Sequence, residues 1–295
     1  MDQFSKLRSS SQGQPAHHPG KPASNQWNEE RVTRHFDHAT DRSEDVYLRQ
    51  ETPGGFFYRR RQAIVMRCLH SRQGDVVADL GCGPGAYAVK VAERGSKYIG
   101  FDLSPRMIAH ARRRHAHLTD AEFMVGDVGN LPLASNSVDA LLCLGMLEYV
   151  PKDDEVAYLA EMARVLKPGG RAVFSFLNAA SPYWIWVERC YPLAKFVVRN
   201  SRAVFGGAKH VRFDECAGEA LPTRRFRLRE RCALLGSMGL EVTEESYFSI
   251  NVLPMPLDQR LSGLSLRLNR KLEPLLEWPF LERLGMGFVI SARKA

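Results

Sequence analysis

The segment from Val76 to Tyr87 constrains the fold more than any other part of the chain. An apolar run leads into an acidic residue and a glycine-rich turn, after which the pattern opens a helix. Glycine adopts positive φ readily and leaves room where a Cβ would clash, so Gly81, Gly83 and Gly85 allow a ligand to approach bare backbone. The free N–H groups at the start of the helix point toward the same place. The segment therefore predicts a nucleotide-type pocket.

The spacing of the glycines indicates which kind of nucleotide would bind. The dinucleotide fingerprint reads G-x-G-x-x-G and places a pyrophosphate on the helix N-terminus, whereas this turn reads G-x-G-x-G. Asp79 stands just before the first glycine, where a carboxylate suits a cationic amine better than a phosphate. S-adenosylmethionine (SAM), a nucleoside that bears an amino acid, has such an amine. The glycines alone are equally compatible with a turn that binds no ligand.

Further carboxylates follow predicted strands. We expect buried strands at 97–101, 121–125, 137–144 and 171–176, the last after a turn at 166–170. Asp102 follows the first of them, where it can accept the ribose hydroxyl protons, and Asp127 follows the second, where it can accept from the adenine amino group beside the backbone of Val128. Ligands of open α/β sheets bind outside the carboxyl ends of the strands. A loop aspartate is usually a helix or turn cap, but three in register with the strands favour a shared ligand site.

These residues lie in motifs that resemble the class I SAM-dependent methyltransferases, in the UbiE-like or methyltransferase type 11 branch. The motifs are VADLGCGPGAYA, GFDLSPRMIAHAR, GDVGNLPLASNSVDALLCLGMLEYV and EMARVLKPGGRAVFSF, between about Val76 and Phe176. The resemblance implies a Rossmann-like, doubly wound α/β sheet of seven strands with the last one antiparallel, N-terminal helices, and a helical cap inserted after strand 5. It implies that SAM is held by Asp79, Gly81, Gly83 and Gly85 at the methionine, Asp102 at the ribose, Asp127, Val128, Leu103 and Met107 at the adenine, and Leu144 at the floor.

The chain divides around this core. Residues 1–27 are polar and read as a disordered tail. Residues 28–73 read as two helices, split at Pro53-Gly54-Gly55, which the resemblance places over the cofactor pocket. Residues 74–295 read as the SAM-binding domain, with a further helix at 224–238, a sixth strand at 240–250 and a last strand at 287–293. Two inserts interrupt it, at 178–220 and 251–285.

The first insert is rich in aromatic residues with small residues and prolines between them. They are Tyr183, Trp184, Trp186, Tyr191, Phe196 and Phe205. Aromatic side chains at this density after the fifth strand are typical of the wall of an apolar substrate pocket. The core of a small helical cap explains them equally well.

The second insert has leucines at helical spacing. They are Leu257, Leu261, Leu264, Leu268, Leu272 and Leu275, with a kink expected near Pro274. Arginines and a lysine lie off that face. We expect an amphipathic helix packed on the sheet through its leucines, and the alternative is a basic helix lying on a membrane surface.

Composition limits the remaining possibilities. The 295 residues carry a formal net charge of +8, much of it from arginines and lysines between 195 and 231, which suits nucleic acid, anionic lipid, a phosphorylated substrate, or simply a solvated face. The fourth strand is followed by Leu144-Gly145-Met146-Leu147-Glu148-Tyr149 and lacks the paired prolines typical of enzymes that methylate base amines, so we do not expect a nucleic-acid substrate. Six cysteines without a C-x-x-C pair predict a reducing, cytoplasmic setting and no metal site.

The expected reaction is in-line transfer of a methyl group to an apolar small molecule, such as an isoprenoid, lipid or polyketide-like metabolite, including a prenyl diphosphate methylated at carbon. Such transfer needs a base only if the acceptor atom loses a proton near the transition state. The candidates are Glu148, Tyr149 and His210, although Glu148 also suits a helix start and His210 a surface. The alternatives are an RNA methyltransferase that uses the basic region, and a non-catalytic SAM-fold binding protein at a membrane surface.

Overall fold

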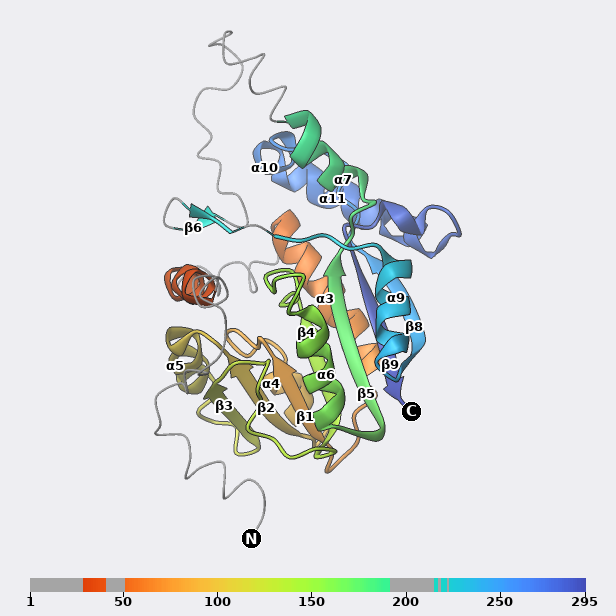
Figure 1. Ribbon diagram of the computed structural model, residues 1–295. Helices are drawn as coiled ribbons and strands as arrows, with labels where there is room; N and C mark the ends of the chain where they lie inside the picture. Colours follow the sequence, from red (N-terminus) through yellow and green to blue (C-terminus); the bar gives the residue numbers. More distant parts are fainter. Residues whose placement is uncertain (1–28, 41–50, 192–214, 217–218, 222) are drawn as a thin grey trace.

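The computed structural model describes residues 29–40, 51–191, 215–216, 219–221 and 223–295 (Figure 1). The predicted tail at 1–27, the aromatic residues Phe196 and Phe205, the basic residues between 195 and 212, and His210 lie outside the described residues.

A mixed sheet of seven strands forms the centre of the molecule, in the order β3-β2-β1-β4-β5-β9-β8. Its strands are β1 (Val76–Leu80), β2 (Lys97–Asp102), β3 (Ala121–Val125), β4 (Val138–Leu144), β5 (Leu166–Leu177), β8 (Leu240–Phe248) and β9 (Gly287–Lys294). β1 to β5 pair in parallel, and β9 runs antiparallel between β5 and β8. The doubly wound sheet with its last strand antiparallel, predicted from the motifs, is confirmed.

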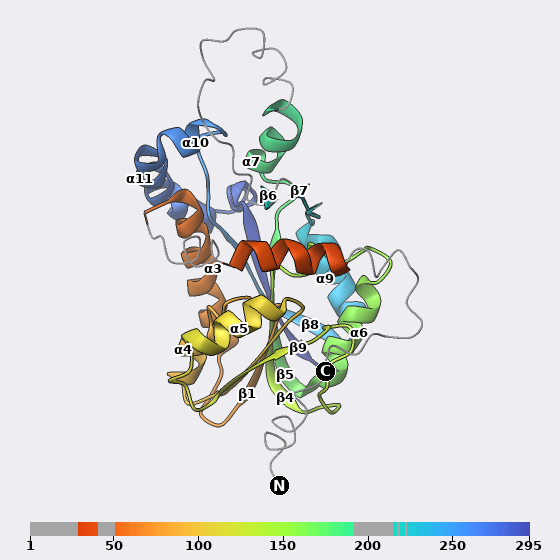
Figure 2. The ribbon, with the colours of Figure 1, turned by 90° about the vertical axis from the view of Figure 1, so that its left-hand side faces the viewer.

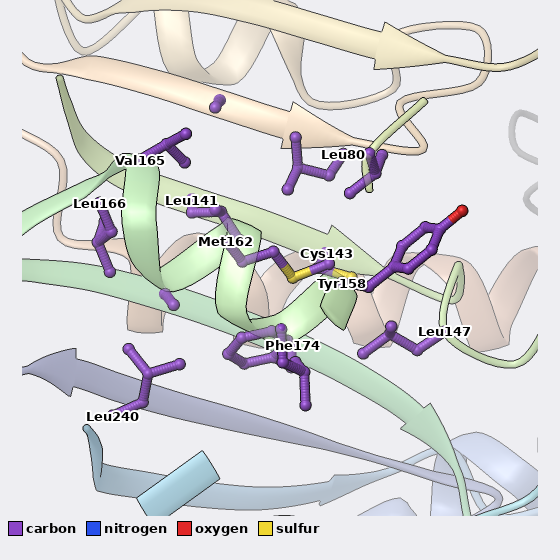
Figure 3. Packing of buried hydrophobic residues seen from close by; sticks show 14 of the residues in the cluster. Leu80, Leu141, Cys143, Leu147, Tyr158, Met162, Val165, Leu166, Phe174 and Leu240 are labelled. Atoms are coloured by element: carbon purple, nitrogen blue, oxygen red, sulfur yellow. The ribbon is translucent and has the colours of Figure 1, made fainter. Parts of the chain in front are cut away.

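Helices cover both faces of the sheet, and each face has its own apolar core. The helices are α3 (Pro53–Leu69), α4 (Ala88–Ala92), α5 (Pro105–Arg114), α6 (Glu155–Val165) and α9 (Leu228–Ser237). Along β4, Leu141 and Cys143 point toward α6 and α9, whereas Leu142 and Leu144 point toward α3, α4 and α5, as the twofold alternation of a strand requires. Figure 3 shows the first of these cores, where Met162 of α6 packs over Leu141 and Cys143.

A helix at 29–40 precedes α3 and lies across the carboxyl ends of the strands, as Figure 2 shows. It is tied to the first turn of α5, because Asp37 accepts hydrogen bonds from the Ser104 hydroxyl and the Arg106 N–H. α3 begins at Pro53, with Thr52 as its N-cap, rather than after the Pro53-Gly54-Gly55 segment. The first N–H of a helix has no partner within the helix, so a proline there costs no hydrogen bond. The Pro53-Gly54-Gly55 segment therefore starts the second helix and does not merely separate two helices.

Two further expectations about the core need correction. The predicted turn at 166–170 lies within β5, which begins at Leu166, as a bulge in which residues 167–170 pair with neither neighbouring strand and Gly169 has a φ of 73°. The helix expected at 224–238 begins only at Leu228, because the preceding residues are extended and Phe226 forms a bridge with Asn178.

The inserts contain short elements at the end of the molecule toward which β5 runs (Figure 1). They are α7 (Pro182–Ile185), the π-helical turn η1 (Trp186–Cys190), β6 (Glu215–Cys216), β7 (Glu219–Ala220), α10 (Leu257–Arg260), α11 (Ser262–Leu272), and the 3-10 helices η2 (Glu273–Glu277) and η3 (Glu282–Leu284). The kink near Pro274 is confirmed, since α11 gives way to η2 there. None of the helices in the described part of the chain is long and apolar enough to cross a membrane.

The predicted packing of the second insert is wrong. Leu257, Leu261 and Leu264 are exposed by 45%, 47% and 49%, and the buried side of α11 consists of Ser265, Leu266 and Asn269. The other predicted leucines, Leu268, Leu272 and Leu275, are half-buried. The first half of the leucine row is therefore turned to solvent, and α11 is held to the protein by a mostly polar side.

Candidate functional site

The three glycines after β1 have the predicted backbone but different roles. Their φ angles are 74° at Gly81, 53° at Gly83 and 74° at Gly85. A Cβ on Gly81 would lie 2.9 Å from the Met146 side chain, and one on Gly85 would lie 2.7 Å from the ring of Phe123. A Cβ on Gly83 would meet nothing within 4 Å. Gly81 and Gly85 therefore permit packing, while Gly83 presents open backbone.

The turn itself uses several of the donors expected to face a ligand. Gly85 N–H donates to the Cys82 carbonyl, and Ala88 N–H donates to the Gly85 carbonyl. α4 starts only at Ala88 and is five residues long. The expected cluster of free N–H groups at a helix N-terminus is thus reduced by bonds within the turn.

Asp79 lies behind the cavity rather than on its wall. The side chain is 2% exposed, and its Oδ2 accepts a 2.7 Å hydrogen bond from the Tyr98 hydroxyl. Burial raises the pKa of Asp79 to about 7, against the opposing effects of the Tyr98 hydrogen bond and the charge of Arg61. Neither Asp79 nor Gly85 is among the residues that line the cavity described below.

Asp102 links the glycine turn to α5. Its Oδ2 accepts from Gly83 N–H at 2.9 Å and its Oδ1 accepts from Ser104 N–H at 2.9 Å. Burial raises the pKa of Asp102, and these two hydrogen bonds lower it. A carboxylate has about four lone-pair positions, so Asp102 keeps acceptor capacity toward the cavity that it lines.

Asp127 follows β3 and is fixed from two directions. Its Oδ1 accepts from Gly129 N–H at 2.8 Å and from the Tyr158 hydroxyl at 2.8 Å. Val128 beside it is buried, as is Met107 of α5. The sequence-predicted residues that the structure brings together on one cavity wall are Gly81, Gly83, Asp102, Leu103, Met107, Asp127, Val128 and Leu144.

The cavity has a volume of about 1220 Å³. Pockets for a single drug-sized ligand run to roughly 1,000 Å³, so the space accommodates a nucleoside and a second molecule. The helix at 29–40 contributes Val32, His35 and Phe36 to one side of it. The first and second inserts contribute Tyr183, Trp184, Met255 and other residues to the opposite side.

Glu148 stands where these two halves meet, after β4. It is 5% exposed, and its Oε1 accepts from Leu177 N–H at 3.0 Å. Burial raises the pKa of Glu148 to about 7, while the charges of Arg61 and Arg225 lower it. Tyr149 also lines the cavity, and its ring packs edge-on against Phe36 with centroids 5.2 Å apart.

The aromatic residues of the first insert divide between the two predicted roles. Tyr183 and Trp184 line the cavity. Trp186 donates from Nε1 to the Met255 carbonyl at 2.9 Å, and Tyr191 is buried at 5% exposure, so both of these pack within the cap. The described part of the insert therefore supplies both the wall of the cavity and the core of the cap.

Arg61, Arg225 and Asp258 are among the charged residues of the cavity wall that were not predicted as site residues. Arg61 of α3 is 7% exposed and Asp258 of α10 is 4% exposed. Arg225 pairs with Glu188 and lies over the Trp184 ring, 4.8 Å from its centroid. These residues come from distant segments and belong to no motif, so the sequence offers no signal that distinguishes them from surface charges.

Asp258 has an unusual environment for a carboxylate. Its Oδ2 accepts from the Tyr183 hydroxyl at 2.7 Å and from Asn251 Nδ2 at 3.1 Å. Its Oδ1 is buried without a hydrogen-bond partner, and burial raises the pKa of the group. Buried polar atoms are nearly always bonded, so an orphan oxygen on a cavity wall is suited to a donor on a bound molecule.

Comparison with known proteins identifies the central region. A family model described as a methyltransferase domain matches residues 77–170. An uncharacterised 37.1 kDa protein in transposon TN4556 of Streptomyces fradiae is 32% identical over 219 residues, which cover 68% of this chain and 61% of the relative. A demethylmenaquinone methyltransferase of Beutenbergia cavernae is 35% identical over 145 residues, or 46% of this chain and 57% of the relative. The matches span between 25% and 61% of the first curated relatives.

Solved structures extend the likeness to the whole fold. A magnesium protoporphyrin IX methyltransferase from Synechocystis, with bound SAH, aligns with a TM-score of 0.60 at 15% identity and covers 90% of this chain and 100% of its own. The [4+2]-cyclase SpnF aligns with a TM-score of 0.56 at 17% identity, covering 90% of this chain and 96% of its own. These likenesses show the Rossmann-like fold of class I methyltransferases.

Proposed function

We propose that this protein, which contains a methyltransferase domain at residues 77–170 and has the class I methyltransferase fold, transfers the methyl group of SAM to an apolar small molecule. The observation that carries the proposal is the large cavity at the carboxyl ends of the strands. Its wall joins the predicted cofactor residues Gly83, Asp102 and Asp127 to an aromatic, partly charged second half.

The cofactor half fits SAM in its donor and acceptor chemistry. Gly83 leaves backbone uncovered, Asp102 has lone pairs for ribose hydroxyls, and Leu103 and Met107 offer apolar surface to an adenine ring. Asp127 is held by Tyr158 and Gly129 in a position to accept from an exocyclic amine. SAM supplies a methyl group on a sulfonium, open to in-line attack. Because Asp79 lies behind the wall, we propose that it acts on the amino acid end of SAM through its charge and its support of the turn.

The second half of the cavity orients the acceptor and handles its proton. Tyr183, Trp184 and Phe248 provide flat apolar surface that excludes water from the reacting atoms. Glu148, with a pKa of about 7, is matched to accept a proton near neutral pH. Tyr149 closes the cavity beside it against Phe36. His210 stays a predicted base, since it lies outside the described residues.

The class of substrate follows from this lining. We favour an apolar metabolite of isoprenoid, lipid or polyketide type, from secondary metabolism, that carries a polar group for Asp258 or Arg225. Relatives named as demethylmenaquinone and ubiquinone biosynthesis methyltransferases support an apolar acceptor. A phosphorylated acceptor such as a prenyl diphosphate would place its charge near Arg61 and Arg225. The free state of the described cysteines supports a reducing, cytoplasmic setting.

Two alternatives have specific support. The [4+2]-cyclase SpnF shares the fold, which favours testing for a bound cofactor without methyl transfer. The basic composition favours testing RNA. Calorimetry with SAH, the demethylated product, tests the cofactor half, and a labelled-SAM assay on quinones, fatty acids and prenyl diphosphates tests the acceptor half. Absence of SAH binding overturns the whole proposal, whereas SAH binding with methyl transfer only to RNA overturns its substrate class.

A further inference from the structure

The second insert presents an apolar helix face to solvent. Leu257, Leu261 and Leu264 follow one another at steps of four and three residues, so they lie along one side of α10 and the start of α11. Each has nearly half of its surface exposed, at 45%, 47% and 49%. Single exposed leucines are ordinary, but three in one row on consecutive helices form an apolar ridge, here called the leucine ridge.

The orientation of this ridge is fixed by polar contacts on the opposite side. Asn269 accepts from Val252 N–H at 3.1 Å and donates to Asn251, and Ser265 also donates to Asn251. Rotation of α11 to bury the leucines would break these bonds and leave buried amides unpaired, which is costly. The exposure of the ridge is therefore specified by the sequence.

A second set of bonds continues the same pattern at the end of the helix. Glu273 is 5% exposed and accepts from Ser249 N–H and Ile250 N–H, each at 3.0 Å. Its carboxylate also accepts from Arg60 Nε at 2.8 Å. These bonds anchor α11 and η2 to the end of β8, so the insert stands as a rigid platform with its apolar row outward.

The charge around the ridge has one sign. Residues 257–272 include four basic side chains, all exposed, at Arg260, Arg267, Arg270 and Lys271. The one acidic residue in that range, Asp258, is buried at 4% exposure and faces the cavity side. The same insert exposes Trp278 by 65% and Phe280 by 86%. Leucines flanked by basic groups are typical of helices that lie in a membrane interface.

We propose that the leucine ridge docks this protein on the surface of a lipid bilayer with anionic headgroups. The leucines enter the acyl boundary while Arg267, Arg270 and Lys271 bind the headgroups. A nucleic acid would use the charges but not the leucines, and a neutral protein surface would use the leucines but not the charges. The bilayer is the occupant that uses both.

The position of the ridge gives docking a consequence for the cavity. α10 exposes Leu257 on its outer side, while Asp258 and Gln259 of the same helix line the cavity, as does Met255 just before it. Docking would therefore bring the second half of the cavity next to the bilayer, where an apolar acceptor is dissolved. This consequence rests on the proposed function, whereas docking itself does not.

The test measures flotation of the full-length protein with vesicles of phosphatidylcholine alone and of equal parts phosphatidylcholine and phosphatidylglycerol. We expect binding to the anionic vesicles that weakens with salt. The triple variant L257S/L261S/L264S should lose about 100-fold in partitioning, since half of each leucine contributes to insertion. The variant R267Q/R270Q/K271Q should bind anionic vesicles no better than neutral ones.

Matched controls separate docking from damage. Val156→Ser removes an apolar side chain that is 50% exposed on α6, and K90Q/R113Q/K152Q removes three exposed charges elsewhere; both should float like the wild type. Calorimetry with SAH should give the same affinity for the ridge variants and the wild type, which shows that they are folded.

Two results would overturn the proposal: a wild type that floats with neither kind of vesicle, and a leucine variant that floats like the wild type. If light scattering also shows that this variant converts a wild-type dimer to a monomer, the ridge is assigned to a second copy of the chain. Absence of SAH binding in every variant, with vesicle binding intact, would contradict the proposed function and leave the docking surface standing.

Discussion

Replacement of Gly83 by alanine isolates the contribution of open backbone to cofactor binding. Gly83 has a φ of 53°, and the added Cβ would meet no atom of the protein within 4 Å. The variant should therefore lose about 1–2 kcal/mol of folding free energy, the cost of placing alanine in the left-handed region. In a large domain each kcal/mol lowers Tm by about 2–4 °C. The methyl group would project where we propose that SAM approaches. Crowding of that kind costs about 1–3 kcal/mol, so SAH should bind about 5- to 150-fold more weakly.

Gly74→Ala is the matched control. Gly74 has a φ of 87° and equally open surroundings, but it precedes β1, at the opposite end of the strand from Gly83. Both variants should lose the same few degrees in a thermal melt without ligand. Titration calorimetry with SAH should then separate them, with weak binding for Gly83→Ala and wild-type binding for Gly74→Ala. Equal affinities in the two variants would refute the placement of the cofactor against this turn.

Further predictions concern the carboxylates. Asp102→Asn should weaken SAH binding about 10- to 100-fold by calorimetry, because it removes a charged acceptor, and an unchanged affinity would exclude the ribose contact. Burial raises the pKa of Asp79 and of Glu148 to about 7, so both carboxyls stabilise the fold when protonated. Stability from Glu148, as much as about 3 kcal/mol, should be lost as the pH rises from its ordinary pKa of 4.5 to its folded pKa of about 7, and Glu148→Gln should flatten the dependence of Tm on pH in that range. Asp258→Asn should raise KM for the acceptor about tenfold with SAH affinity unchanged, and an equal loss of both would assign Asp258 to the fold.

The sheet could be predicted because its signals are local. β3 occupies 121–125 as expected, and β2 extends the expected strand by one residue, to Asp102. Parallel strands buried on both faces appear as apolar runs. An acid marks the carboxyl end of the first three, since Asp79 and Asp102 lie in the last two residues of β1 and β2 and Asp127 follows β3 by two residues. Cys82 and Cys143, which lie in these core motifs, are exposed by only 6% and 1%. The Pro168-Gly169-Gly170 segment is also a local signal, because residues 167–170 stay unpaired between Leu166, which pairs with Val138, and Arg171, which pairs with Ala140 and Arg293.

The packing of the second insert could not be predicted, because the leucine spacing identifies a helix but does not show which of its sides contacts the rest of the protein. The periodic rule assumes that the apolar side is buried. Here the partners of Asn269 and Glu273 are backbone groups at the end of β8, in residues 249–252. Such contacts between a loop and a helix leave no periodic trace. Only the positions of both segments in space show that the polar side faces inward.

The two halves of the cavity are built in different ways, and this difference explains how far sequence reasoning reached. The cofactor half comes from consecutive strand ends within residues 77–170, the range that the family model matches. The acceptor half is assembled from α3, the end of β4, the segment before α9, and α10, which supply Arg61, Glu148, Arg225 and Asp258. Each of these segments can change without disturbing the turn after β1. A fold with this division retains one cofactor while its acceptor varies, so the acceptor must be sought through residues outside the shared motifs.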